Sequence, residues 1–276
     1  MPSIAQALRQ AQDSGLARPD AQRLLGHLLK RERAWLIAHD DQPLDATLAS
    51  ALADGCRRCA AGEPLAYVIS EQDFYGLRLR VTPAVLVPRP DTETLVDWAL
   101  DVLPTLAMPQ PRVLDLGTGS GAIALAVAQG HAAATVSATD ISAEALAVAR
   151  GNAQRLGLAI GLSQGAWWQA VAAAQRFDLV LSNPPYIAAG DAHLPALRHE
   201  PLLALSPGGD GLDAYRQIIA GAAAHLAPAG WLLFEHGWDQ AAAVADLLRE
   251  AGFSHIGSRN DLAQRPRCTG GSWLAG

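Results

Sequence analysis

The spacing of hydrophobic and polar residues changes twice along the chain. Over the first 62 residues, apolar positions recur with the period of a helix, and four leucines of the run 21–30 share one helical face. A second run, 46–62, begins after the potential N-cap residue Asp45 and ends at a glycine. These signals predict a small helical bundle.

From residue 71 the period shortens to two. Leu77, Leu79 and Val81 alternate with arginines, which is typical of a half-buried strand, and Tyr75-Gly76 fits the turn of a β-hairpin. Three prolines in 83–90 then restrict the backbone and predict a stiff connection. We therefore expect a helical domain over 1–70, a hairpin and linker over 71–90, and a larger domain over 91–276.

Strands and helices alternate in this larger domain. The runs RVLDLG, ATVSATD, IGLSQG, FDLVLSN and GWLLFEHG predict short strands, and the segments between them have helical spacing. Because the strands are apolar throughout, both faces of the sheet should be covered, and the alternation favours parallel pairing. The expected fold is an α/β, doubly wound domain, in which ligands bind beyond the carboxyl ends of the strands.

Charge is distributed unequally along the chain. The formal net charge is −6, and the acids exceed the arginines by seventeen to ten over 91–276, whereas 1–90 carries ten arginines and Lys30 against ten acids. Proteins that neutralise several phosphates usually carry a basic face on the domain that does so. The acidic larger domain therefore argues against a direct nucleic-acid partner.

The cysteines and the N-terminus indicate a cytoplasmic protein. Three cysteines do not form a secreted disulfide framework, and Cys56 and Cys59 fit a helical face better than a metal or redox pair. The first residues lack the apolar core of a signal peptide, and no run reaches the ~20 apolar residues of a membrane span. We expect no membrane association and no metal.

The first candidate binding element is DLGTGSGA, residues 115–122, between a predicted strand and helix. Gly117, Gly119 and Gly121 permit a tight turn and close approach of a ligand, and Thr118 and Ser120 complete the loop. The spacing also fits a dinucleotide site or a plain strand-to-helix turn. The carboxylate of Asp115 would repel a pyrophosphate and suits an ammonium and a sulfonium, which favours S-adenosylmethionine.

A second candidate, Asp140, ends the next predicted strand. An acid here can accept hydrogen bonds from both ribose hydroxyls of an adenosine ligand, although it could also cap the following helix. Ser142 could cap that helix equally well. Asp140 therefore supports nucleoside binding without choosing the cofactor.

The third candidate is the tetrapeptide Asn183-Pro184-Pro185-Tyr186, directly after the strand FDLVLS. The prolines hold the chain extended and leave the Pro184 carbonyl as an acceptor beside the Asn183 side-chain oxygen. Two acceptors match the two hydrogens of one NH2 group, and Tyr186 offers a face for a planar amide or base. Holding both hydrogens orients the nitrogen toward an electrophile. A simple proline-rich turn is the alternative.

Together these motifs resemble those of class I methyltransferases with an NPPY tetrapeptide. The segments VLVPRPDTETLVDWAL, HEPLLALSPGGDGLDAYRQII and LLFEHGW narrow the resemblance to the protein (glutamine-N5) methyltransferases of the HemK/PrmC family, nearly from end to end. The resemblance implies methyl transfer to the Gly-Gly-Gln glutamine of class I release factors. By this resemblance, residues 117–121 and Asp140 would bind the cofactor. The tetrapeptide 183–186 would bind the glutamine, and Asn183 would also lie beside the cofactor.

The chain departs from the family pattern at two positions. Ala166 stands where an acid is frequent, before the pair Trp167-Trp168, one of which is expected to cover the adenine; Gln264 stands where glycine is common. Alignment by the aromatic pair favours Trp167 as the residue that covers the adenine. Counting back from Asn183 without gaps favours Trp168 for the same role. His236 is expected to have a hydrogen-bonded packing role.

The expected reaction is an in-line displacement that needs no metal, no covalent intermediate and no strong general base. An adenine-N6 methyltransferase of DNA or RNA is the nearest alternative, because an exocyclic NH2 group fits the same tetrapeptide. A nucleotide-binding regulatory module without catalysis is the second alternative. Turnover separates an enzyme from such a module.

We also expect the helical domain to recognise the protein partner, since one amide offers too little contact to select it.

Overall fold

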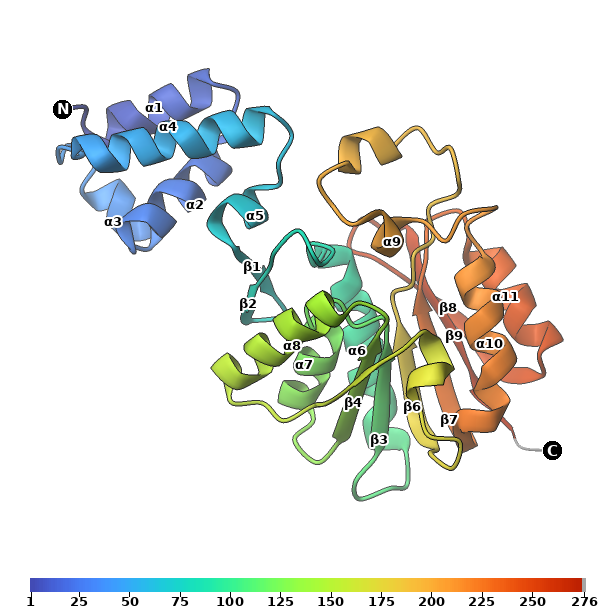
Figure 1. Cartoon of the computed structure of the whole chain (residues 1–276). Helices are drawn as coiled ribbons and strands as arrows, with labels where there is room; N and C mark the ends of the chain where they lie inside the picture. The colour runs from blue at the N-terminus through green and yellow to red at the C-terminus, as the bar shows by residue number, and fades with distance from the viewer. Residues whose placement is uncertain (275–276) are drawn as a thin grey trace. The chain divides into compact units, whose positions relative to one another are not determined.

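Separate hydrophobic cores organise the two parts of the chain in the computed structural model, which describes residues 1–274. The contacts divide the chain into a first unit, Met1–Glu71, and a second unit, Gln72–Gly276 (Figure 1). The last two residues of the predicted larger domain lie outside the described part.

The first unit is a helical bundle, as its periodicity predicts. Its helices are α1 (Ile4–Asp13), α2 (Arg18–Leu29), α3 (Arg33–Ala38), α4 (Ala46–Ala60) and α5 (Leu65–Ile69). Ser3 starts α1 with a capping box, and the Asp45 carboxylate starts α4 by accepting from the Leu48 N–H at 2.9 Å. Leu24, Leu25 and Cys56 are buried in the core, so Cys56 packs as a small apolar side chain.

The predicted hairpin is present, with β1 (Glu71–Phe74) and β2 (Leu77–Arg80) joined at Tyr75 and Gly76. Both turn residues have positive φ, 48° and 73°, as tight hairpins of matching twist require. Tyr75 is held by Glu93, which accepts from its N–H at 2.8 Å. Phe74 is buried in the core of the second unit with Leu77 and Leu79, so the hairpin packs as part of that unit.

A seven-stranded sheet of order β5-β4-β3-β6-β7-β9-β8 forms the centre of the second unit. Its strands are β3 (Arg112–Leu116), β4 (Thr135–Asp140), β5 (Gly161–Gln164), β6 (Phe177–Ser182), β7 (Leu226–Glu235), β8 (Phe253–Asn260) and β9 (Pro266–Trp273). Strands β5, β4, β3, β6 and β7 pair in parallel with their neighbours. Strand β9 is antiparallel to both of its neighbours, β7 and β8. The mostly parallel sheet is confirmed, and β8 and β9 are additions that the sequence did not predict.

Helices cover both faces of this sheet (Figure 1). Helices α6 (Glu93–Val102), α7 (Ala122–Gly130) and α8 (Ala143–Leu156) contribute to one core, and α10 (Asp213–His225) and α11 (Ala241–Glu250) to the other. Short helical turns are η1 (Pro90–Thr92), η2 (Leu103–Thr105), η3 (Trp167–Ala170), η4 (Leu194–Leu197) and α9 (Leu202–Leu205). Every residue of β6 is buried, as continuous hydrophobicity predicts for a doubly wound domain.

The order of the strands brings two of the candidate motifs together. From β3 the chain builds β4 and β5 on one side, and it then returns to β6 on the other side of β3. The last residues of these adjacent strands, Leu116 and Ser182, pair with each other. The glycine loop and Asn183 therefore start side by side at the switch point, where doubly wound sheets bind ligands.

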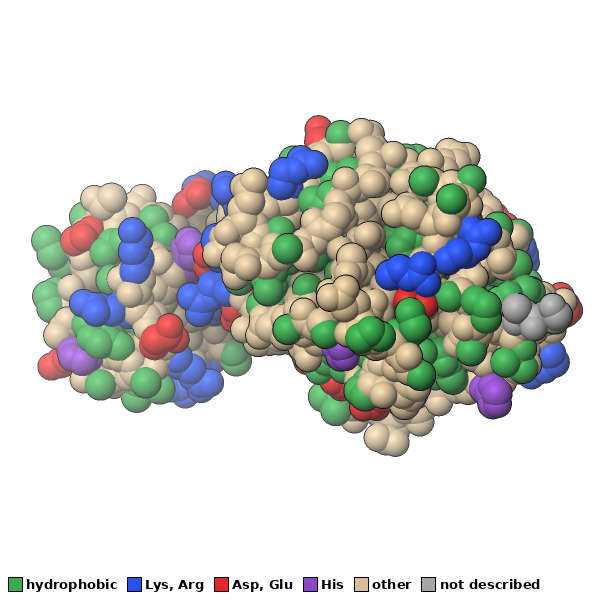
Figure 2. All heavy atoms as spheres, turned by 90° about the horizontal axis from the view of Figure 1, so that it is seen from below, with side chains coloured by type: hydrophobic (Ala, Val, Ile, Leu, Met, Phe, Trp, Pro, Cys, Tyr) green, Lys and Arg blue, Asp and Glu red, His purple; other side chains and the backbone are tan. Residues whose placement is uncertain are grey.

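Charged side chains are interspersed on the surface. On the face drawn in Figure 2, the lysine and arginine side chains lie singly or in small groups among neutral and apolar atoms. That face of the molecule shows no continuous basic strip of the kind that follows a phosphate backbone. Among residues 1–274, no helix is both long enough and apolar enough to cross a membrane.

Candidate functional site

A cavity of about 490 Å³ opens at the carboxyl ends of β3, β4 and β6. Its walls come from the glycine loop, the end of β4, the tryptophan pair, the tetrapeptide, the proline-rich linker and the segment before α10. The wall consists of residues 83–86, 88, 89, 92, 117–120, 122, 123, 140–142, 144, 145, 165–167, 183, 185, 201, 203, 204, 206, 207, 214 and 217. A cavity of this size suits a small organic ligand.

The glycine loop forms one side of the cavity. Gly119 has a φ of 55°, and a Cβ atom placed there would meet no atom within 4 Å, so the backbone faces open space. Thr118 and Ser120 also line the cavity. Gly121 is not part of the wall; a Cβ there would approach Ala149 at 3.2 Å, so this glycine lets α7 pack against α8. The loop thus serves both ligand approach and helix packing.

Asp115 lies beneath the loop and is not part of the cavity wall. Its Oδ2 accepts from the Thr118 hydroxyl at 2.6 Å, and its Oδ1 is buried with no hydrogen-bond partner among the described residues. Burial raises the pKa of Asp115 to about 7, against the hydrogen bonds from Thr118 and the Ala124 backbone, which lower it. A buried acid with an unused oxygen fits a ligand that brings a hydrogen-bond donor or a positive charge.

Asp140 connects the glycine loop to the next helix. Its Oδ2 accepts from the Gly119 N–H and its Oδ1 from the Ser142 N–H, each at 2.9 Å. The Ser142 hydroxyl accepts from the Ala145 N–H at 3.1 Å and caps α8, so the capping function falls to Ser142. Asp140 lines the cavity with its remaining acceptor capacity.

The two tryptophans have different environments. Trp167 lines the cavity, lies 3.4 Å from the position that a Cβ of Gly117 would take, and donates from Nε1 to Gln217 at 3.2 Å. Trp168 instead donates to the Ile218 carbonyl at 2.8 Å and stacks on His225 with ring centroids 4.9 Å apart. Of the two alternatives, the geometry favours Trp167 as the aromatic wall. Ala166 lines the cavity without a polar group.

This difference predicts opposite effects for two matched substitutions. We expect Trp167→Ala to weaken cofactor affinity about tenfold, the effect of losing a stacking surface, with a small change in stability. Trp168→Ala should instead lower the free energy of unfolding by about 2 kcal/mol, because it empties a packed site beside α10. Calorimetric titration and chemical denaturation of both variants check this. Equal effects of the two variants on cofactor affinity would contradict the assignment.

The tetrapeptide presents its residues in different directions. Asn183 and Pro185 line the cavity, whereas Pro184 and Tyr186 are not part of its wall. The Asn183 Nδ2 donates to the Thr92 Oγ1 at 3.3 Å, which leaves Oδ1 as the free acceptor. Pro184 is buried, and its carbonyl accepts no hydrogen bond from another described residue. The Tyr186 side chain packs against the core formed with α10 and α11.

The linker forms part of the cavity wall, as the family resemblance implies, through residues that the sequence analysis did not name. The Glu200 carboxylate accepts from the Val87 N–H at 3.0 Å and forms an ion pair with Arg89. Arg89 and Pro201 both line the cavity, so this pair joins two segments of its wall. An acid within the apolar segment HEPLLAL was the available signal, but its partners lie more than 100 residues earlier in the chain.

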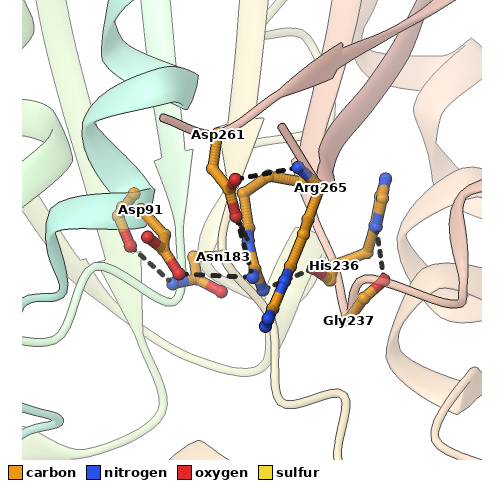
Figure 3. A network of polar contacts seen from close by, with 8 residues as sticks. Asp91, Asn183, His236, Gly237, Asp261 and Arg265 are labelled. Carbon is orange, nitrogen blue, oxygen red and sulfur yellow. Dashed lines mark hydrogen bonds and ion pairs between the residues drawn. The ribbon is translucent and has the colours of Figure 1, made fainter. Parts of the chain in front are cut away.

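A second polar cluster lies behind Asn183 (Figure 3). Arg267 is buried and contacts Asp91 and Asp261, each at 3.2 Å, and it donates to the His236 carbonyl at 3.3 Å. His236 is fully buried and bonded through both ring nitrogens, which confirms its packing role. In the adjoining turn Gln264 has a φ of 61°, a left-handed conformation that favours glycine.

Comparisons with known proteins give a consistent result. Residues 95–236 match the family model of the methyltransferase small domain, and residues 3–69 match that of the PrmC N-terminal domain. A release factor glutamine methyltransferase from Bordetella pertussis is 51% identical over 94% of this chain and 96% of its own length. One from Xylella fastidiosa is 48% identical over 96% of both chains.

A solved structure supports the fold. The Thermus thermophilus 16S rRNA N2 G1207 methyltransferase, in complex with AdoMet and guanosine, aligns with a TM-score of 0.56 at 19% identity. The alignment covers 73% of this chain and 49% of that one. At this identity the likeness concerns the methyltransferase fold alone.

Proposed function

The chain belongs to the release factor glutamine methyltransferases, and on this basis we propose that it transfers a methyl group from S-adenosylmethionine to the side-chain nitrogen of the Gly-Gly-Gln glutamine in a class I release factor. The position of Asn183 supports this most directly. Asn183 lines the cavity that the glycine loop forms on another side, and its Oδ1 is free because Nδ2 donates to Thr92. The reaction belongs in the cytoplasm, where translation terminates.

The residues around the cavity fit S-adenosylmethionine. Gly117 and Gly119 leave room for close approach, Asp115 offers an unpartnered buried oxygen near the loop, and Asp140 has acceptor capacity for the ribose hydroxyls. Trp167 provides a flat wall for the adenine ring. When bound, the cofactor supplies an electrophilic methyl group on a sulfonium.

The protein's own contribution is to orient the glutamine amide. An amide nitrogen is a poor nucleophile because its lone pair is delocalised, so it must be held with that pair directed at the methyl group. The Asn183 Oδ1 and the Pro184 carbonyl would each accept a hydrogen bond from one N–H of the glutamine amide. Both would stabilise the positive charge that develops on the nitrogen. The Tyr186 side chain is not part of the cavity wall and packs on the core, so it would support the tetrapeptide from behind. The proton leaves to water after transfer.

Substrate class can be tested with labelled S-adenosylmethionine and four separate acceptors: an unmodified class I release factor, the same factor with its Gly-Gly-Gln glutamine changed to alanine, duplex DNA and structured RNA. We expect label in the first acceptor alone. The excess of seventeen acids over ten arginines in residues 91–276 disfavours polyanions. Label on adenine without label on the factor would favour an adenine-N6 methyltransferase, and binding without turnover would favour a regulatory module.

We further propose that the first unit recognises the release factor. Its core is built from its own residues, and every residue that lines the cavity belongs to the second unit. Removing residues 1–71 should therefore leave cofactor affinity nearly unchanged and raise the KM for the release factor about tenfold, because part of the contact surface is lost. Steady-state kinetics with the intact factor check this. Equal KM values for the two proteins would contradict it.

A further inference from the structure

Helix α8 carries a fully buried amide that the reaction described above does not use. Asn152 is 0% exposed and lies on this helix, in the second unit. It is not part of the cavity wall. Burying a side-chain amide is costly unless its donors and its acceptor find partners, so the partners of Asn152 indicate what it holds in place.

Both polar atoms of the Asn152 side chain bond to the backbone of other segments. Its Nδ2 donates to the Ser120 carbonyl at 2.9 Å and to the Arg80 carbonyl at 3.0 Å, and its Oδ1 accepts from the Arg80 N–H at 2.7 Å. An amide side chain has two N–H donors, so these bonds use both of them. Asn152 therefore connects α8 to the glycine loop and to β2 at the same time.

On the side of the glycine loop, Asn152 supplies the donor for a buried carbonyl. Ser120 is 3% exposed and lines the cavity, and no backbone N–H within residues 1–274 donates to its carbonyl. One turn earlier on the same face of α8, Ala149 packs against the loop, 3.2 Å from the position that a Cβ of Gly121 would take. The helix thus holds the loop by a packing contact and by a hydrogen bond.

On the other side, Asn152 fixes the chain just before the linker. Arg80 ends β2, and Pro83 begins the part of the linker that lines the cavity. One turn later on α8, Arg155 donates to the Arg78 carbonyl, so the same helix face holds β2 at two points. Because the prolines restrict the backbone of the linker, fixing Arg80 also fixes where the linker enters the cavity wall.

We propose that Asn152 is a positioning residue that sets the distance between the glycine loop and the linker wall of the cavity. This inference rests on the proposed function, because the linker continues to Thr92, the partner of Asn183, and the cofactor would lie on the loop. Methyl transfer is sensitive to the spacing of the reacting atoms, and a displacement of about 1 Å caused from outside the site can cost about 100-fold in rate. The effect of Asn152 would pass through Ser120 and Arg80.

Two substitutions of Asn152 test this role. Asn152→Asp keeps an acceptor for the Arg80 N–H but removes the donors to both carbonyls, and Asn152→Ala removes all three bonds. With cofactor and release factor both saturating, we expect single-turnover rates at least about tenfold below the wild type in each variant. Cofactor affinity should also fall about tenfold, the effect of losing one ordinary hydrogen bond to the loop.

Two control variants separate positioning from added charge and from lost stability. Gln154→Glu makes the same amide-to-carboxylate change at an exposed position of α8. Leu248→Ala removes a fully buried side chain of α11 from the core on the other face of the sheet, so it should lower the free energy of unfolding. At a temperature at which every variant is folded, both controls should keep the wild-type rate and cofactor affinity.

Amide hydrogen exchange tests the same connection in the wild type, without a substitution. The Arg80 N–H lies outside the cavity wall and donates to Asn152. If Asn152 couples this bond to the loop, the demethylated cofactor product should slow exchange at Arg80 more than at the amides of α11. The difference should disappear in Asn152→Asp, which keeps the acceptor for this N–H.

The possible outcomes separate the inference from the proposed function. If the wild type methylates the release factor and both Asn152 variants keep its rate and affinity, the inference is wrong and the proposed function stands. Equal losses in Leu248→Ala, or exchange at Arg80 that does not respond to the cofactor product, would also overturn it. If the wild type does not methylate the factor, the proposed function fails, and cofactor affinity and exchange at Arg80 still test the connection through Asn152.

Discussion

Replacing Asn183 with alanine is expected to lower the single-turnover rate of methyl transfer by about 100-fold or more, the scale seen when one preorganised polar group at a reacting centre is removed. The reason is that Asn183 lines the cavity and keeps its Oδ1 free, since its Nδ2 donates to Thr92. Without it, one N–H of the glutamine amide has no acceptor, and the nitrogen is no longer directed at the methyl group.

Cofactor affinity should be measured on the same preparation of Asn183→Ala. Most of the cavity wall, including Asp140 and Trp167, is unchanged by this substitution, so we expect affinity to stay within about threefold of the wild type, well under the effect of one charged hydrogen bond. A variant with unchanged turnover would remove Asn183 from the mechanism. Loss of affinity equal to the loss of rate would make Asn183 a cofactor-binding residue instead.

Asp140→Ala is expected to have the complementary effect, weakening S-adenosylmethionine binding by about 100-fold, or a few kcal/mol. Charged hydrogen bonds to the two ribose hydroxyls would be lost. The carboxylate also accepts from the N–H groups of Gly119 and Ser142, so the glycine loop would lose its connection to the start of α8. Both effects reduce affinity for the same ligand.

Glu144→Ala is the matched control for this substitution. Glu144 is an exposed acid on the same cavity wall, and it forms no bond to the glycine loop in the described residues. Calorimetric titration with S-adenosylmethionine, its demethylated product and NAD should show binding of the first two alone in the wild type. Similar losses in Asp140→Ala and Glu144→Ala would indicate a general charge effect, and tight NAD binding would contradict the cofactor assignment.

Local patterns were sufficient to predict much of the fold. The period of the apolar residues indicated the helices of the first unit, and continuous hydrophobicity indicated the buried strands β3, β6 and β7. Motifs at strand ends were informative because parallel strands bring their carboxyl ends to one edge. For that reason Gly119, Asp140 and Asn183, which are far apart in sequence, line one cavity.

The strands β8 and β9 were missed because packing, and not hydrophobicity, determines their residues. A Cβ at Gly270 would lie 2.4 Å from the Leu233 Cδ2, so the close contact with β7 requires glycine there. β8 carries polar residues with only partial burial, a pattern that resembles a loop. Neither strand therefore has the composition from which a strand is normally predicted.

Contacts between distant segments were the other part that the sequence did not indicate. Glu200 reaches the linker at Val87 and Arg89, and Thr92 reaches Asn183, across intervals with no periodic signal. The directions of individual side chains were equally inaccessible: Trp167 and Trp168 are neighbours in sequence, yet one lines the cavity and the other packs on α10. Such choices depend on tertiary packing.

The most direct test of the proposed reaction is to locate the methyl group by mass spectrometry of the release factor after a complete single turnover. Fragmentation of the peptide that contains Gly-Gly-Gln should place one added methyl group on the glutamine side chain, at its nitrogen. The same peptide from a reaction with Asn183→Ala should be largely unmodified. A methyl group on another residue of the factor, or an unmodified factor despite consumption of S-adenosylmethionine, would contradict the assignment of this chain's reaction.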